Sequence, residues 1–93
     1  MSDKEAFYTK LKDSLEDTTK FPAEYLYKFI VPAKGNKVQE IEDIFKNKLA
    51  NISTKESKTG KYISVSIKVN LASADEVILH YRAAEKVEGI ISL

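Results

Sequence analysis

His80 is the only histidine in the 93-residue chain, and it is the first candidate for acid–base or metal chemistry. Glu76 lies one helical turn before it, but a general base or a metal ligand needs further partners, and the chain has no second histidine and no cysteine. The absence of cysteine also excludes disulfide scaffolds and thiol catalysis. We therefore predict that His80 is a structural residue at the boundary of a helix's apolar face. The protein is predicted not to be an enzyme, with no catalytic residues, no metal and no cofactor.

Gly35 and Asn36 are the second candidate, because they follow an apolar segment and precede a predicted helix. The free amides and partial positive charge of a helix N-terminus bind carboxylates and phosphates, so this turn is a candidate ligand-binding site. Single-glycine motifs are common in ordinary turns, and a plain turn with an N-cap residue is the favoured interpretation.

Ammonium and hydroxyl groups on one face of a predicted sheet are the third candidate. Strand alternation places four of them together, Lys28, Ser64, Ser66 and Lys68. RNA-binding sheets stack bases on aromatic side chains, and Ser64 and Ser66 stand at those positions here. The formal net charge of +1 also supplies no field that attracts phosphates. We expect this face to contact a protein partner or a second copy of the chain, and not a nucleic acid.

The composition fits one small domain. Hydrophobic residues make up 43% of the chain, and 15 Lys and Arg are balanced by 14 Asp and Glu, which argues against a polybasic membrane anchor. No apolar run approaches the roughly 20 residues that a membrane span requires. The first ten residues also lack the pattern of a signal peptide. The expectation is a cytoplasmic protein without membrane contact.

Three helices are predicted from capping boxes, in which a small polar residue precedes Glu or Gln by three positions. The pairs are Ser2 with Glu5, Asn36 with Gln39, and Ser73 with Glu76. They begin amphipathic segments over about residues 3–17, 37–50 and 74–85. On the second segment one face carries Val38, Ile41, Ile44, Phe45 and Leu49.

Four strands are predicted, over about residues 25–31, 51–58, 62–71 and 87–93. Residues 62–71 alternate strictly between apolar and polar side chains, the pattern of a half-buried strand. Thr59-Gly60 indicates a hairpin turn, and Gly89 indicates a bend in the last strand.

The order of these elements predicts an α+β protein, a ferredoxin-like βαββαβ sandwich. It has a four-stranded antiparallel sheet, two helices on one face and an extra N-terminal helix. We divide the chain into an N-terminal helical extension, residues 1–20, and a single ferredoxin-like domain, residues 21–93.

The N-terminal helix must find a packing partner. A helix of about fifteen residues does not persist alone in water, so its stripe of Phe7, Leu11 and Leu15 has to be buried. Because the other two helices cover one face of the sheet, we expect the stripe on the sheet edge, on the open face or on a neighbouring subunit.

Several segments resemble the YbeD-like family of small uncharacterised bacterial proteins. They are Tyr27-Lys28-Phe29-Ile30, the stretch from Gly60 to Ile67, Val77 with Tyr81, and the closing Ile91 and Leu93. The resemblance covers residues 21–93, and His80 departs from it where an apolar residue is expected. It implies a ferredoxin-like fold similar to ACT domains, which are small regulatory modules that bind amino acids or other metabolites. The family has no established site, so no ligand residue is implied.

Two functions remain open. The preferred hypothesis is a non-enzymatic regulatory or protein-interaction module that acts through its sheet surface or through self-association. The alternative is an ACT-like sensor of a small metabolite, such as an amino acid, that uses the Gly35-Asn36 turn. A pocket of several hundred Å³ favours the sensor, and a flat surface with a large two-fold contact favours the interaction module.

Overall fold

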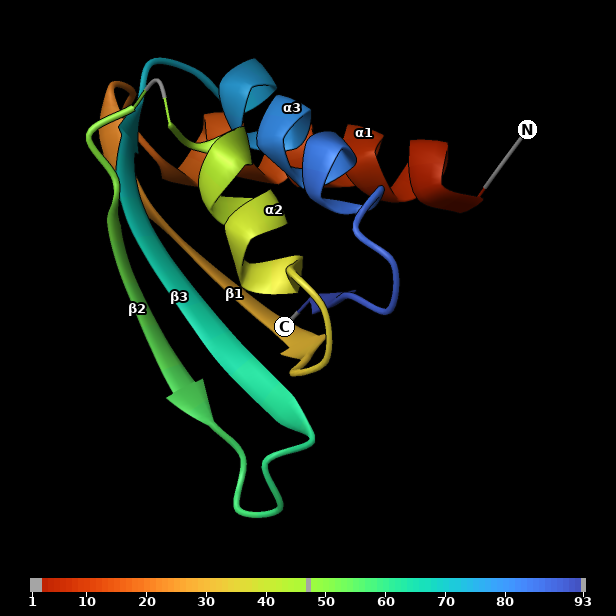
Figure 1. Cartoon of the computed structure of the whole chain (residues 1–93). Coiled ribbons are helices and arrows are strands. Elements are labelled where there is room, and N and C mark those ends of the chain that lie inside the picture. Colours follow the sequence, from red (N-terminus) through yellow and green to blue (C-terminus); the bar gives the residue numbers. More distant parts are fainter. Residues whose placement is uncertain (1–2, 47, 93) are drawn as a thin grey trace.

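A computed structural model describes residues 3–46 and 48–92, with three helices and four strands in these ranges. The elements in chain order are α1 (Asp3–Thr18), β1 (Ala23–Pro32), α2 (Lys37–Ile44), β2 (Asn51–Glu56), β3 (Tyr62–Leu71), α3 (Ala74–Ala84) and β4 (Ile91–Ser92). The strands form one antiparallel sheet in the order β2-β3-β1-β4, and the helices lie on one side of it (Figure 1). The predicted ferredoxin-like α+β fold with an additional N-terminal helix is confirmed.

Strand β3 forms over the predicted residues because its side chains alternate. Val65, Ile67, Val69 and Leu71 are buried, whereas the residues between them are exposed or half-buried. Strand β1 pairs with β3 along its whole length, from Ala23 opposite Leu71 to Pro32 opposite Tyr62. Tyr27 and Phe29 of β1 therefore face the same core as the apolar residues of β3.

The capping box that begins α3 is present in a slightly altered form. The Glu76 amide donates to Ser73 Oγ at 3.2 Å, as predicted, while Glu76 Oε1 accepts from the Ala72 amide, one residue before the cap. The predicted box at α2 is wrong. Asn36 makes no side-chain cap hydrogen bond, and Gln39 Nε2 donates to Asp43 Oδ1 instead. The third predicted cap residue, Ser2, lies outside the described residues.

Helix α2 ends at Ile44, several residues before the predicted boundary near residue 50. The amide of Phe45 donates to the carbonyl of Glu42, three residues back, so the last turn tightens and the chain turns away. Phe45 still reaches the core, where it is buried, but Leu49 is fully exposed, and its predicted place on the apolar face is wrong. No Gly or Pro marks this boundary, so the periodicity alone predicted a longer helix.

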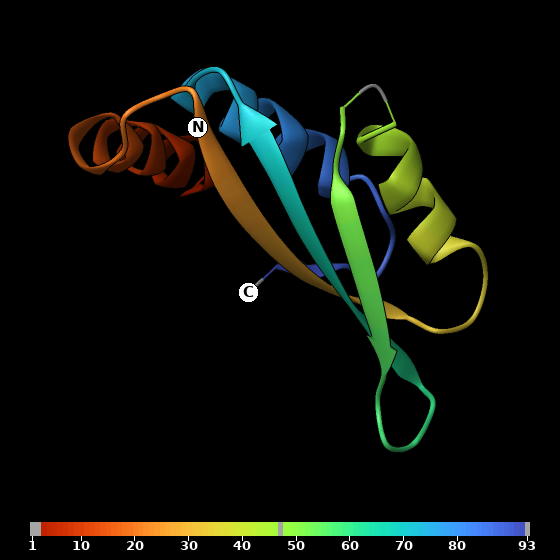
Figure 2. The same ribbon diagram turned by 90° about the vertical axis from the view of Figure 1, so that its left-hand side faces the viewer.

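Helix α1 lies in the helix layer beside α3 and next to the N-terminal half of β1 (Figures 1 and 2). Tyr8 and Leu15 are buried and Leu11 is half-buried, whereas Phe7 is 60% exposed. Leu11 and Leu15 thus keep their predicted places in the stripe, and Tyr8 takes the place of Phe7. The stripe packs within its own chain, beside α3 and the core, and not on the open face of the sheet.

The sequence predicted a strand over residues 87–93, but in the part that the structure describes β4 spans Ile91–Ser92 alone. Leu93 lies outside the described residues. Val87 is buried as part of a loop, and Gly89 makes the predicted bend with φ of +81°. A Cβ atom at Gly89 would lie 2.8 Å from Pro32 Cγ, so the loop approaches the end of β1 too closely for any larger residue. Within the two described ranges, β4 pairs with β1 at Phe29 and Ile30.

Candidate functional site

A pocket of about 460 Å³ opens between the N-terminal half of α1, the end of α3 and the short strand β4. We call it the α1 pocket. Its lining residues come from all three of these elements and from β1 and the loop before β4. They are Lys4, Phe7, Tyr8, Leu11, Phe29, Tyr81, Ala84, Glu85, Ile90 and Ser92. Among the described residues, β4 pairs with β1 at two positions, and the pocket lies beside this edge of β1, under α1.

Aromatic rings form a continuous wall of the α1 pocket. The ring centroids of Phe7 and Tyr8 lie 5.4 Å apart, those of Tyr8 and Tyr81 lie 6.3 Å apart, and those of Tyr81 and Phe29 lie 6.1 Å apart. Contacts of this kind prefer edge-to-face or tilted geometries, which these rings adopt, and they hold one another in place. The wall runs from the exposed Phe7 at the surface to Phe29 in the core.

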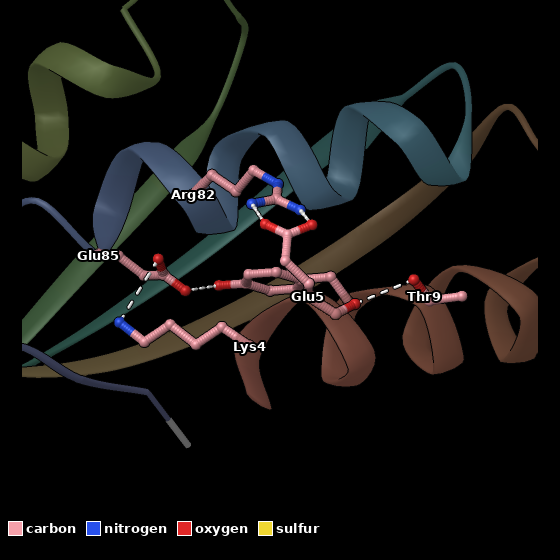
Figure 3. Close-up of polar contacts among 6 residues, drawn as sticks. Lys4, Glu5, Thr9, Arg82 and Glu85 are labelled. Atoms are coloured by element: carbon pink, nitrogen blue, oxygen red, sulfur yellow. Dashed lines mark hydrogen bonds and ion pairs between the residues drawn. The ribbon is translucent and has the colours of Figure 1, made fainter. Parts of the chain in front are cut away.

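Polar contacts between α1 and α3 close the rim of the pocket (Figure 3). The Tyr8 hydroxyl donates to Glu85 Oε1, and Lys4 Nζ lies 3.7 Å from Glu85 Oε2. Burial and the hydrogen bond to Glu85 raise the pKa of Tyr8 well above its usual value, so the phenol stays a proton donor.

A second ion pair holds α1 on the outer side of the same rim. The Arg82 guanidinium binds both oxygens of Glu5, at 2.8 and 3.0 Å, and lies 4.8 Å from the centre of the Tyr8 ring. Hydrogen bonding to Arg82 lowers the pKa of Glu5, so the pair is charged near neutral pH. Lys12 and Asp75, 3.0 Å apart, form a further contact between the two helices.

The two residues predicted as a ligand-binding turn lie away from the α1 pocket. Gly35 has φ of +87°, and Asn36 is the exposed first residue before α2. Neither lines the pocket, and a Cβ atom at Gly35 would have no neighbour within 4 Å. The positive φ of Gly35 suits a tight turn before α2, and the pocket between α1, α3 and β4 lies elsewhere in the fold. Whether the turn binds a ligand stays a prediction.

The four residues predicted on the sheet surface are brought together on the open face. Lys28 is directly opposite Ser66, and Ser64 and Lys68 are the neighbours of Ser66 on the same face of β3. Figure 2 shows this side of the sheet without a covering helix. Strand β2 adds residues that the sequence reading missed, since Lys55 lies opposite Ser64 and Ser53 opposite Ser66.

A family model described as "Protein of unknown function (DUF493)" matches residues 16–93. The chain belongs to the DUF493 family. This is the family that the sequence resemblance indicated. The match begins near the end of α1, so Lys4, Phe7, Tyr8 and Leu11 of the α1 pocket lie outside it.

Two solved structures share the fold of this DUF493 protein. Protein HP0495 from H. pylori is 16% identical with a TM-score of 0.65, and the match covers 82% of this chain and 86% of that one. The ACT domain from GTP pyrophosphokinase of Chlorobium tepidum is 13% identical with a TM-score of 0.54, covering 76% of this chain and all of that domain. A search of curated proteins finds no match. In the described residues, no helix of this DUF493 protein is both long and apolar enough to span a membrane.

His80 is buried in the DUF493 protein, whereas the sequence predicted a structural residue at the boundary of the apolar face of the helix. Its ring stacks on Phe45 at 4.8 Å, and Nδ1 donates to the Glu76 carbonyl at 2.7 Å. A carbonyl only accepts, so Nδ1 carries a proton in this contact. Its neighbours are an aromatic ring and a backbone carbonyl, which makes it a packing residue.

The residues that build the α1 pocket could not be assembled from sequence reasoning. Glu85 and Tyr8 are 77 positions apart, and each is unremarkable beside its own neighbours in the chain. The one signal that the sequence offers is the concentration of five tyrosines in 93 residues. Two of the five, Tyr8 and Tyr81, line the pocket as well as pack beneath it.

Proposed function

We propose that the protein is a non-enzymatic domain that binds a small molecule in the α1 pocket. The observation that carries this proposal is a hollow of about 460 Å³ with ring-lined apolar walls and a few polar groups at its rim. Ligand sites have volumes of about 300–1,000 Å³ and this same mixture of apolar walls and sparse polar groups. This is the metabolite-sensor hypothesis that the sequence left open, with the binding site at the α1 pocket in place of the Gly35-Asn36 turn.

A regulatory role is part of the proposal. The similarity to the ACT domain from GTP pyrophosphokinase is a similarity of fold, and it favours a binding role by analogy alone. Besides the tyrosines, the described part of the chain lines the pocket with one acid and one base, Glu85 and Lys4, which are paired with each other. A binding role needs no more than these groups provide.

The test is thermal unfolding in the presence of a panel of small molecules. The panel contains the proteinogenic amino acids, nucleotides, and amines and carboxylates with aryl or alkyl bodies. A ligand at about 100 times its Kd adds about 2.7 kcal/mol to the stability, which a melting curve resolves. We expect at least one member to raise the Tm, and a panel without any binder overturns the proposal.

Two variants of strand β4 locate the binding. Ser92 lines the α1 pocket, whereas its neighbour Ile91 lies opposite Ile30 on the other side of the sheet. Ser92→Phe should fill the pocket and abolish the Tm increase, and Ile91→Phe should leave it intact. Binding that survives Ser92→Phe but is lost in Gly35→Val assigns the ligand to the turn and contradicts the α1 pocket.

Protein interaction through the open sheet face is a second candidate function. Lys28, Lys55 and Lys68 are exposed there, and within residues 3–46 and 48–92 none of them is in an ion pair. Exposed apolar side chains accompany them on this face, namely Leu26, Tyr62 and Ile91. Positive charge beside apolar surface fits an acidic segment of a partner protein that also carries apolar side chains.

Charge reversal tests this second candidate. We expect that an acidic partner captured by the wild-type protein is lost in the double variant Lys28→Glu, Lys68→Glu. The matched control is Lys10→Glu, Lys86→Glu, which makes the same change of net charge at exposed positions on the helix side. Capture that is equal in both double variants contradicts an interaction through the open face.

A further inference from the structure

We propose that the ligand of the α1 pocket is an organic ammonium, a protonated amine on an apolar body, whose cationic head binds Glu85. This inference rests on the proposed function, because it names the chemical class of the molecule in the same pocket. Among the described residues that line the pocket, Glu85 is the only acid, and it lies where the apolar wall meets the rim.

One carboxylate oxygen of Glu85 accepts a hydrogen bond from the protein, and the other has only a long contact with an ammonium group. Oε1 accepts the hydrogen bond of the Tyr8 hydroxyl, which fixes the orientation of the carboxylate. Oε2 has the Lys4 ammonium at 3.7 Å, which is longer than the 2.7–2.9 Å of a good charge-assisted hydrogen bond. The carboxylate thus has room for a closer cationic donor.

Lys4 marks the place that a ligand ammonium would take. Its side chain is 68% exposed, so water solvates its charge and the contact with Glu85 is weak. A ligand ammonium attached to an apolar body would reach Glu85 from inside the pocket, where less water competes. It would displace Lys4, which could then swing into solvent.

The aromatic wall favours the same sign of charge. Four rings, those of Phe7, Tyr8, Tyr81 and Phe29, line the pocket, and the faces of aromatic rings attract cations. The nearby Arg82 guanidinium already lies over the Tyr8 ring, but Glu5 holds it through two hydrogen bonds outside the pocket. A carboxylate ligand would face Glu85 with like charge and would gain only the exposed Lys4.

Three probes of similar size separate the possibilities, 2-phenylethylamine, 2-phenylethanol and 3-phenylpropanoate. They share a phenyl body and carry a cationic, neutral or anionic head. Titration of the full chain by calorimetry or NMR should give a Kd for the amine at least about 10-fold lower than for the alcohol, with the carboxylate weakest.

Two variants make the assignment specific. Glu85→Gln keeps an acceptor for Tyr8 and removes the charge, so it should abolish the preference for the amine while the alcohol binds as before. Lys4→Gln removes the competing ammonium and should tighten amine binding. Circular dichroism checks that both variants fold.

The outcomes distinguish this inference from the proposed function. Amine preference that is lost in Glu85→Gln supports the ammonium assignment. Equal or tighter binding of the alcohol or the carboxylate, still blocked by Ser92→Phe, overturns the ammonium class and leaves a small-molecule site in place. If none of the three probes binds, the inference is overturned, and the wider panel then decides on the proposed function.

Discussion

The Tyr8 hydroxyl donates a hydrogen bond to Glu85, 77 positions further along the chain, and so fastens the first helix to the end of α3. The contact does two things at once. It satisfies a phenol that would otherwise be buried without a partner, and it orients Glu85, the acid that lines the α1 pocket in the described residues. Stability of the N-terminal helix and formation of the pocket are therefore consequences of the same contact.

Deletion of residues 1–19 should lower the Tm without changing the oligomeric state. Tyr8 and Leu15 are almost fully buried within the same chain, and burial of two such side chains contributes about 3–6 kcal/mol before ordering costs. Melting curves and light-scattering mass measure the two quantities. A fall in the number of associated subunits would show that α1 also contacts a neighbouring copy, and an unchanged Tm would show that the helix contributes nothing to the fold.

A pair of point variants tests the same packing without removing the helix. Leu15→Ala should destabilise the protein by about 2–4 kcal/mol, because it leaves a cavity beside the core. Lys10→Ala, at an exposed position of the same helix, should change the stability by less than about 0.5 kcal/mol. Equal effects of the two substitutions would contradict the assigned face of α1.

Val65→Asp should destabilise the protein by several kcal/mol, because it places an unpaired carboxylate in the core. The matched control is Ser64→Asp, one residue earlier on the open face, where water solvates the charge. We expect a loss of less than about 1 kcal/mol there. Denaturant unfolding gives both values. Near wild-type stability of Val65→Asp would contradict the assignment of faces in β3.

Strand β3 was predictable because its information is local. Each side chain of residues 62–71 alternates in polarity, so the sequence itself specifies which face is buried. The end of α2 was not predictable in this way, since Phe45 and Leu49 share one helical face until the chain turns. Burial of Phe45 against His80 outweighs the periodicity, and that contact joins residues 35 positions apart.

For the candidate sites too, local sequence patterns predicted one surface, whereas contacts between distant residues form the other. The open-face residues Lys28, Ser64, Ser66 and Lys68 come from strand alternation and were predicted together. The α1 pocket depends on how far β4 pairs along β1 and on where α1 docks. Both are set by contacts between the two ends of the chain, and no pattern in either end specifies them.

In the Glu76→Gln variant, the free energy of unfolding should fall less as the pH is lowered below about 4.5 than it does in the wild type. The Ala72 amide, followed by Lys48, lowers the pKa of Glu76 below its ordinary value of 4.5. A carboxylate with a lowered pKa in the folded state stabilises the protein above about pH 4.5. That stabilisation is lost as the pH falls through the lower, folded-state pKa.

The expected loss for Glu76→Gln near neutral pH is about 1 kcal/mol, since Glu76 binds a backbone amide and a half-exposed ammonium. Urea unfolding between pH 2.5 and about 7 measures the curve. Glu88→Gln, at an exposed position after α3, is the control and should keep the wild-type pH dependence. A Glu76→Gln curve parallel to that of the wild type would contradict the role given to this carboxylate.

Gly89→Ala should destabilise the protein more than Gly35→Ala, although both glycines have similar positive φ, +81° and +87°. The backbone penalty of an L residue in this region is about 1–2 kcal/mol and applies to both. Only at Gly89 does the new Cβ meet another atom, Pro32 Cγ at 2.8 Å, whereas the space around Gly35 is open. The difference in stability between the two variants therefore measures the effect of the contact with Pro32, separately from the backbone strain that both variants share.

The clash in Gly89→Ala has a second expected effect, on the α1 pocket. Relief of the contact with Pro32 requires the loop to move, and the loop leads directly into Ile90 and Ser92, which line the pocket. Any molecule that binds there should lose affinity in Gly89→Ala and keep it in Gly35→Ala. Equal stability and equal affinity in the two variants would show that the approach of the loop to β1 neither constrains the fold nor shapes the pocket.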